Sequence, residues 1–191
     1  MKLGEPKAVR WRRADYYKMA DAGLFDWRRV ELIEGKVFEM SPQDSLHASA
    51  VMLADDVMRT IFKHGYPVRV QMPLSLGDDS DPEPDIAIVA GSPRHYLNAH
   101  PSTALLIIEV ASSSLSYDRS LKASLYASKG IEDYWILNLI DRQLEVRRNP
   151  RPDASQPYGF GYADVTIFAE ADSLSPLAAP QATIAASGLL P

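Results

Sequence analysis

The chain has 191 residues, of which 46% are hydrophobic, a formal net charge of −5 and no cysteine. This size predicts a single domain over residues 1–191, with its core at about 13–170. Without cysteine, disulfides and thiolate chemistry are excluded, so any metal needs oxygen or imidazole ligands. The acidic balance counts against a protein that coats DNA through bulk electrostatics. There is no apolar run of about 18 residues and the N-terminus is charged, so we expect a cytoplasmic protein without a membrane partner.

The first third of the chain is predicted to form a helix, a hairpin and a longer helix. Residues 13–22 are typical of a short helix. Within residues 30–40, Glu34 and Gly35 separate two runs in which apolar and polar residues alternate, which indicates a tight hairpin. In residues 44–64 the apolar side chains recur at helical spacing, and this is the longest predicted helix.

The middle of the chain is predicted to form three strands and a second core-facing helix. The strands cover residues 68–76, 85–90 and 104–111, which are rich in aliphatic and β-branched side chains. The third strand is almost entirely apolar, so we expect it at the centre of the sheet. Residues 117–129 carry apolar positions four apart and are predicted to be helical.

The last part of the chain is predicted to complete the sheet. Residues 133–139 and 143–149 indicate a β-hairpin, and residues 165–170 one more strand. Residues 150–162, rich in proline, glycine and polar groups, are predicted to be a loop. The tail 172–191 shows no clear hydrophobic periodicity, and we assign no function to it. The order of these elements predicts an α/β (α+β) fold, with a central mixed β-sheet flanked by helices.

Two carboxylates lie in strands that ought to be buried. Glu109 interrupts an apolar strand, and Asp85 opens another directly after Pro84. An unpaired carboxylate in such a place costs several kcal/mol, so a cation, a basic side chain or hydrogen-bond donors must compensate it. For Glu109 alone, an internal salt bridge and a metal site explain the sequence equally well. A second carboxylate on an adjacent strand favours the metal site.

Lys122 is the basic residue that completes this set. A magnesium ion is held by one or two carboxylates and keeps several waters, so Asp85 and Glu109 could hold it together with a phosphate oxygen. A nearby lysine can orient or deprotonate the attacking water and stabilise charge on the phosphate. Lys122 follows Glu109 by 13 residues, enough for a loop and a helical turn to fold back. The competing interpretation is an exposed helix lysine.

Other polar residues carry weaker signals. Glu31 sits in the predicted hairpin, where a solvent-facing glutamate is the simpler interpretation. His47 lies near the start of the long helix, within reach of the site, but a lone histidine is more often structural. The sequence has no histidine pair at metal-ligand spacing, no G-x-S-x-G and no glycine-rich phosphate loop. Serine hydrolases and nucleoside-triphosphate enzymes therefore lose their main support.

Three segments together resemble the Uma-two family of proposed restriction endonucleases, bacterial members of the PD-(D/E)xK nuclease superfamily. RRVELIEGKVFEMSP at 28–42, followed by His47, looks like the opening motif of the family. PEPDIAIV at 82–89 looks like its PD motif. IEVASSSLSYDRSLKASLYASKGIEDYWILN at 108–138 resembles its long signature almost position for position. The resemblance covers most of the chain.

The resemblance implies a restriction-endonuclease-like core that hydrolyses phosphodiester bonds in DNA. It implies that Asp85 and Glu109 hold Mg²⁺ (or Mn²⁺). The superfamily usually places its lysine two residues beyond the second acid, where this chain has Ala111. The lysine role passes instead to Lys122, a relocation that the family shares, and Glu31 joins the catalytic set.

The resemblance also marks three supporting residues and leaves two functional hypotheses. Gln71, Tyr126 and His47 are expected around the site rather than at its centre. The first hypothesis is a Mg-dependent endodeoxyribonuclease acting on DNA, with a homodimer as an open option because double-strand cleavage needs two sites. The alternative is a catalytically silent nuclease-fold protein that acts as a DNA-binding or protein-interaction module, with Glu109 and Lys122 as a structural ion pair.

Overall fold

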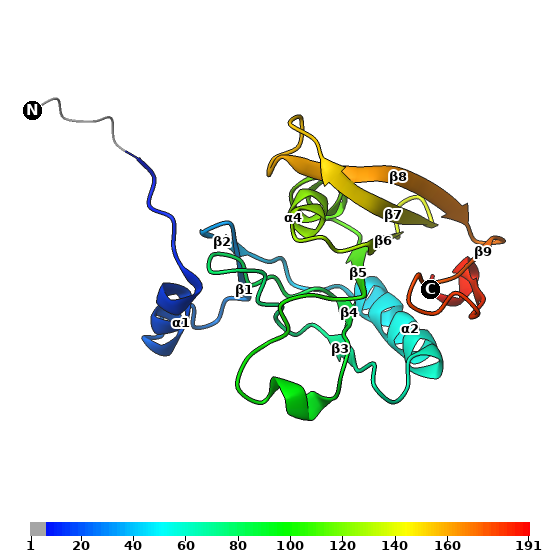
Figure 1. Cartoon of the computed structure of the whole chain (residues 1–191), viewed down its shortest axis with the longest axis horizontal. Coiled ribbons are helices and arrows are strands. Elements are labelled where there is room, and N and C mark those ends of the chain that lie inside the picture. Colours follow the sequence, from blue (N-terminus) through cyan, green and yellow to red (C-terminus); the bar gives the residue numbers. More distant parts are fainter. Residues whose placement is uncertain (1–6) are drawn as a thin grey trace, which may run out of the picture.

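A six-stranded mixed sheet forms the centre of the computed structural model, which describes residues 7–191 (Figure 1). The strand order is β3-β4-β5-β6-β7-β8, and only β5 and β6 pair in parallel. Residues 1–6, included in the predicted domain, lie outside the described part. The strands are β3 (Val68–Val70), β4 (Ile86–Ile88), β5 (Leu106–Ala111), β6 (Asp133–Asn138), β7 (Gln143–Pro152) and β8 (Phe160–Ala169).

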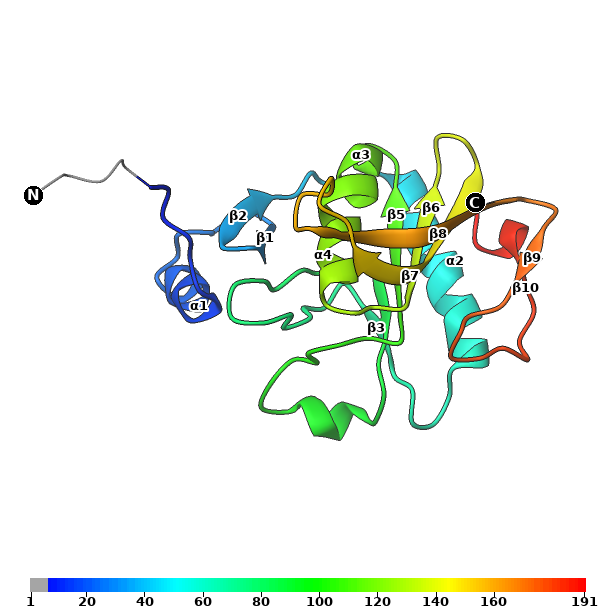
Figure 2. The same cartoon turned by 45° about the horizontal axis from the view of Figure 1, so that its top comes forward.

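Helices cover both faces of this sheet (Figure 2). The helix α2 (Ser45–Ile61) lies on one face, and a continuous helical segment, α3 (Leu115–Tyr117), η2 (Asp118–Lys122) and α4 (Ala123–Ser128), lies on the other. This second segment is the crossover that joins the parallel strands β5 and β6. The predicted α/β (α+β) class, with a mixed sheet flanked by helices, is confirmed.

Strand β5 lies between the two helical layers, and all six of its residues are buried. Because side chains alternate along a strand, Leu106, Ile108 and Val110 join the core under α2, whereas Ile107 and Ala111 join the core under α4. This alternation turns Glu109 toward α4. The prediction that this strand is central is confirmed, and its register decides which helix meets the buried acid.

The N-terminal elements agree with the predictions. Helix α1 (Arg13–Asp21) precedes a two-stranded hairpin of β1 (Val30–Ile33) and β2 (Lys36–Glu39). Its turn residues Glu34 and Gly35 both have positive φ, as a two-residue hairpin turn requires. Figures 1 and 2 show α1 at one end of the molecule, away from the large sheet.

Two strand predictions are wrong in their extent. The strand predicted at 68–76 stops at Val70, because Gln71 adopts a left-handed backbone with φ of 50° and Pro73 has no N–H to donate to a neighbour. The loop predicted at 150–162 is shorter than expected and covers only residues 153–159. Strand β7 extends to Pro152 and β8 begins at Phe160, five residues before the prediction.

Prolines in the extended part of β7 explain the second error. Beyond Arg148, β7 pairs only with β8 and no longer with β6. Pro150 and Pro152 therefore lie where one edge of the strand has no neighbour, and a missing N–H is tolerated at such an edge. The presence of proline in the sequence could not show that one edge of β7 would lack a neighbouring strand.

The C-terminal segment packs against the face of the sheet that carries α2. It contains β9 (Ser173–Leu174), β10 (Ile184–Ala185) and η3 (Ala186–Gly188). Leu174, Leu189 and Leu190 are buried in the same core as α2, and Figure 1 shows the red C-terminal segment beside that helix. Among residues 7–191, every helix falls short of the length and apolarity needed to cross a membrane.

Candidate active site

The ends of β4 and β5 bring Asp85 and Glu109 together. The two strands are antiparallel with Ile86 opposite Ile108, so Asp85, one residue before β4, comes opposite Glu109. The backbone N–H of Asp85 lies 3.3 Å from Glu109 Oε2. Both side chains are buried, at 7% and 3% exposure. The predicted placement on adjacent strands is therefore found in the structure.

Glu109 receives two hydrogen bonds from the helical crossover. Lys122 Nζ donates to its Oε1 at 3.0 Å, and the Tyr126 hydroxyl donates to the same oxygen at 2.6 Å. The four-residue spacing places both donors on one helix face. Burial raises the pKa of Glu109 to about 8, although the ammonium group of Lys122 opposes this rise. The charge of Glu109 is thus marginal near neutral pH.

Lys122 is a buried cation held by two carboxylates. Its Nζ lies 3.0 Å from Glu109 and 3.3 Å from Glu31 Oε2, and its side chain is 3% exposed. Burial lowers the pKa of Lys122, but Glu109 and Glu31 outweigh it and leave this pKa well above its ordinary value. The interpretation of an exposed helix lysine does not hold.

Glu31 is also buried, so its interpretation as a solvent-facing hairpin residue is wrong. Only 1% of it is exposed. The Tyr117 hydroxyl donates to Oε1 at 3.0 Å, and the Glu83 N–H donates to Oε2 at 3.2 Å. The hairpin therefore docks against the crossover helix through Glu31, and its carboxylate helps to hold Lys122.

Asp85 is surrounded by donors from three other segments. His47 Nε2 lies 3.2 Å and Gln71 Nε2 3.0 Å from Oδ1, and the Val110 N–H donates to Oδ2 at 2.9 Å. Burial raises the pKa of Asp85, but these hydrogen bonds outweigh it and leave the pKa below its ordinary value. The hydrogen bond to Asp85 raises the pKa of His47.

Asp118 was missed by the sequence predictions. It lies one turn before Lys122, in the π-helical turn, and is 2% exposed. The Ser114 hydroxyl donates to its Oδ2 at 2.5 Å. Burial raises the pKa of Asp118 to about 6. The spacing of Asp118, Lys122 and Tyr126, four residues apart, was the available signal, but aspartate in a helix usually faces solvent.

A cleft of about 250 Å³ opens onto these groups. Glu31, Gln71 and Tyr126 do not line it; they lie behind the residues that do, and hold them. The charged or titratable side chains that line it are Arg29, Glu39, Asp44, His47, Glu83, Asp85, Glu109, Tyr117, Asp118 and Lys122. The predicted site residues thus divide into a cleft-lining set and a supporting set.

The donor set suits a hard divalent cation bound mainly by water. Asp85 and Glu109 offer carboxylate oxygens at one edge of the cleft, and no thiolate competes. Over residues 7–191, no group of three or more His, Asp or Glu side chains is arranged to hold a metal ion. Two carboxylates and several waters match what magnesium accepts, so the residues fit Mg²⁺ in this limited sense.

The fold is that of a nuclease-like α+β protein. It resembles the crystal structure of "a putative nuclease belonging to DUF820" from Anabaena variabilis ATCC 29413, with a TM-score of 0.63 and 18% identity over 85% of this chain and 89% of that chain. The model of the Uma2 family, described as "Putative restriction endonuclease", matches residues 13–187. The chain therefore belongs to the Uma2 family, as its motifs predict. No curated protein matches the sequence.

Proposed function

We propose that the protein is a divalent-metal-dependent DNA endonuclease that hydrolyses phosphodiester bonds. The observation that carries this proposal is an excess of buried acid at one cleft. Glu31, Asp85, Glu109 and Asp118 are all at most 7% exposed, and their basic contacts among the described residues are the ammonium of Lys122 and the imidazole of His47. A bound divalent cation would stabilise the ionised forms of these buried acids.

In this proposal Asp85 and Glu109 hold Mg²⁺ or Mn²⁺ at the end of the cleft. A bound ion of this kind acts as a Lewis acid on a phosphoryl oxygen and lowers the pKa of a coordinated water. Gln71 and His47 fix the carboxylate of Asp85, and Tyr126 fixes that of Glu109. The supporting residues therefore act by keeping the two carboxylates in place.

Lys122 acts as a cation in this proposal. Its ammonium lines the cleft and is held by Glu109 and Glu31. A protonated lysine donates hydrogen bonds to oxygens on which negative charge grows, so it stabilises the transition state of phosphodiester hydrolysis. Because the carboxylates keep its pKa well above the ordinary value, Lys122 is not the group that removes a proton from water.

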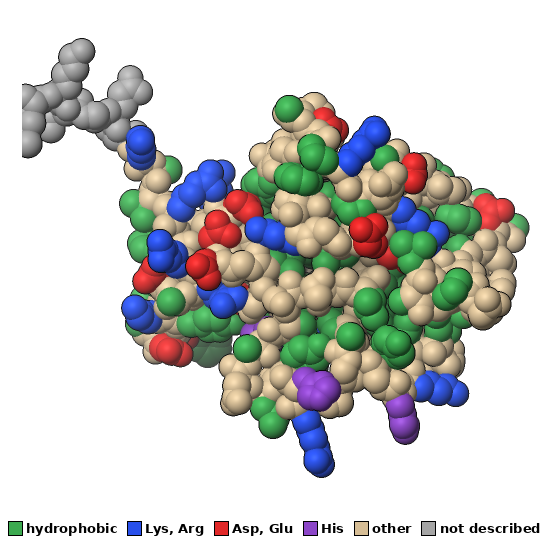
Figure 3. Space-filling view, in the orientation of Figure 1, with side chains coloured by type: hydrophobic (Ala, Val, Ile, Leu, Met, Phe, Trp, Pro, Cys, Tyr) green, Lys and Arg blue, Asp and Glu red, His purple; other side chains and the backbone are tan. Residues whose placement is uncertain are grey.

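Arg29 is the candidate for contact with a DNA phosphate. It lines the cleft, and its Nε lies 3.6 Å from Glu83. On the face drawn in Figure 3, Lys and Arg side chains are interspersed with acidic ones over α1 and the hairpin. In this proposal the DNA is contacted at the cleft. Cutting both strands needs two such sites, so the proposal extends to a homodimer that works on cytoplasmic DNA.

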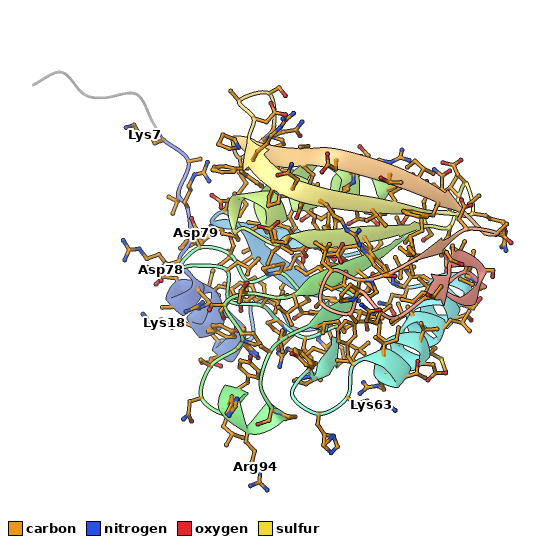
Figure 4. All side chains as sticks on the ribbon, turned by 45° about the vertical axis from the view of Figure 1, so that its right-hand side comes forward. Lys7, Lys18, Lys63, Asp78, Asp79 and Arg94 are labelled. Atoms are coloured by element: carbon orange, nitrogen blue, oxygen red, sulfur yellow. The ribbon has the colours of Figure 1, made fainter. Side chains whose placement is uncertain are left out.

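The first prediction concerns cleavage. The wild type should nick or linearise plasmid DNA in Mg²⁺ or Mn²⁺, and EDTA should stop it. Asp85→Ala and Lys122→Ala should each reduce the rate at least about 100-fold, since the first removes a ligand of the metal ion and the second removes a cation that stabilises transition-state charge. Asp78→Ala and Lys63→Ala are matched controls, because both side chains project from the surface (Figure 4). Equal rates for the wild type and both site variants would refute the catalytic role.

The second prediction separates this function from the non-catalytic alternative. The ion pair of Lys122 and Glu109, at 3.0 Å, is also what a structural role would require. A ligand that binds only the folded state raises its stability by about 2.7 kcal/mol at 100 times its Kd. Saturating Mn²⁺ should therefore raise the Tm of the wild type but not of Asp85→Ala. If Mn²⁺ leaves both melts unchanged and DNA still binds, the binding module is the better description.

A further inference from the structure

Among the buried acids at the cleft, Asp118 differs in its partners. Glu31 and Glu109 contact Lys122, and Asp85 contacts His47. Within the described part of the chain, no cationic nitrogen lies within 4 Å of Asp118, and its only side-chain partner is the neutral hydroxyl of Ser114. A buried carboxylate without a contacting cation is costly. Such a group in a cleft is a candidate for chemistry.

Only one of the two oxygens of Asp118 is engaged. Ser114 donates to Oδ2, whereas over residues 7–191 no donor lies within hydrogen-bond distance of Oδ1. The backbone carbonyl of Asp118 accepts from the Tyr134 hydroxyl at 3.0 Å, which fixes this turn of the helix. Asp118 lines the same cleft as Lys122 and Glu109, so a water in that cleft is the partner that we expect for its second oxygen.

The other candidates for a proton acceptor are already engaged. Lys122 Nζ is paired with Glu31 at 3.3 Å and with Glu109 at 3.0 Å. His47 is bound to Asp85 through Nε2, and Glu109 accepts from Lys122 and Tyr126. Hydrolysis of a phosphodiester nevertheless needs a group that takes a proton from the attacking water. Of the buried acids that line the cleft, Asp118 is the one that the described residues leave with an open oxygen and no basic side chain in contact. The other acids of the lining are Glu83, which pairs with Arg29, and the exposed Glu39 and Asp44.

We propose that Asp118 is the catalytic base of the reaction, accepting the proton of the attacking water at Oδ1. This inference rests on the proposed nuclease function. The water oxygen forms the new bond to phosphorus while the bond to the leaving oxygen breaks. The leaving oxygen takes a proton from solvent, and Asp118 later returns its proton to solvent through the cleft. No oxidant, reductant or further co-reactant is needed.

The charged groups around Asp118 determine the pH range in which it is ionised and can accept a proton. Lys122 and the Ser114 hydroxyl favour its ionised form, whereas Asp85, Glu31 and Glu109 disfavour it. Burial is the largest influence and raises the pKa of Asp118 to about 6. An acid with this pKa is mostly ionised at pH 7 to 8, yet basic enough to accept a proton. The contribution of Asp118 to the pH dependence should therefore be a rise in the cleavage rate through about pH 6.

The test is the pH profile of DNA cleavage by the full chain at saturating Mg²⁺. Asp118→Asn should lower the rate by about 100-fold to 10,000-fold and abolish the acidic limb. Asp118→Glu keeps a carboxylate at this position, so its pH profile should keep an acidic limb. Ser114→Ala removes a hydrogen bond that favours the charged form, so its limb should move to higher pH. Ser120→Ala, an exposed change on the same helix, should leave the profile unaltered.

Binding measurements separate a base from a metal ligand. Asp118→Asn should keep the Mn²⁺-induced rise in Tm and the affinity for a DNA duplex in Ca²⁺. Loss of the Mn²⁺ effect would make Asp118 a ligand and overturn its role as base. A rate within about threefold of the wild type would overturn it as well. A wild type that binds metal and DNA but never cuts would instead refute the nuclease function on which the inference rests.

Discussion

Replacing Lys122 by methionine should lower the free energy of unfolding by about 3–5 kcal/mol, as measured by urea unfolding in EDTA. The ammonium is 3% exposed and contacts Glu31 and Glu109, which are themselves buried. Methionine fills a similar volume, so the loss comes mainly from two acids left without their cation. The matched control is Lys129→Met, since Lys129 pairs with Glu34 at 3.5 Å but is 27% exposed. Its cost should stay below about 1 kcal/mol.

The loss in Lys122→Met should grow with pH. Burial raises the pKa of Glu109 from its ordinary 4.5 to about 8 even with Lys122 present, and removal of the lysine raises it further. An acid whose pKa is raised by folding destabilises the folded state as pH rises above its unfolded pKa. In the folded wild type Glu109 ionises only above about pH 8, so below that pH both proteins carry the same cost from this group. The deficit should thus be nearly constant from pH 5 to 7 and should grow above about pH 8. Adding Glu109→Gln should recover part of the stability at pH 9, and equal deficits at pH 7 and pH 9 would contradict this account.

The central acids could be predicted from the sequence because their burial follows from local composition. A glutamate inside LLIIEVA has no exposed face to occupy, and an aspartate after Pro84 opens a strand of similar character. Their adjacency also followed, since β4 and β5 are consecutive strands of one sheet. The sequence thus restricts the chemistry of the site to a small set of residues.

The burial of Glu31 and Asp118 could not be predicted, because it depends on docking between distant segments. Glu31 alternates with apolar neighbours in a short hairpin, a pattern that equally suits an exposed face. Its carboxylate is buried only because Tyr117 and Lys122, more than 80 residues later, come to meet it. Asp118 is turned inward in a π-helical turn, a local irregularity that periodicity does not indicate.

The structure of the C-terminal segment could not be predicted from hydrophobic periodicity, for a related reason. Its structure consists of two-residue strands and one short 3₁₀ turn, which are too short to show a repeating pattern. It is held to the molecule by a few apolar side chains that reach the core under α2. Only the tertiary structure therefore indicates that this segment contributes to stability.

Leu189→Ala should accordingly lower the free energy of unfolding by about 2–5 kcal/mol, because Leu189 is fully buried in the core shared with α2. Leu177→Ala is the matched control in the same segment, since Leu177 is 48% exposed and should change stability by less than about 0.5 kcal/mol. Thermal and urea unfolding both measure the difference. Equal stability of the two variants would show that the segment is not bound to the core.

The same pair of variants tests whether the two faces of the sheet act separately. Leu189 belongs to the core under α2, whereas Glu109 is turned toward α4 on the other face. At a temperature where both variants are fully folded, the cleavage rate of Leu189→Ala should match that of Leu177→Ala. A variant that loses stability but keeps its rate would assign the C-terminal segment to the scaffold. A rate that falls with stability would mean that strain crosses the sheet through β5 to the carboxylates.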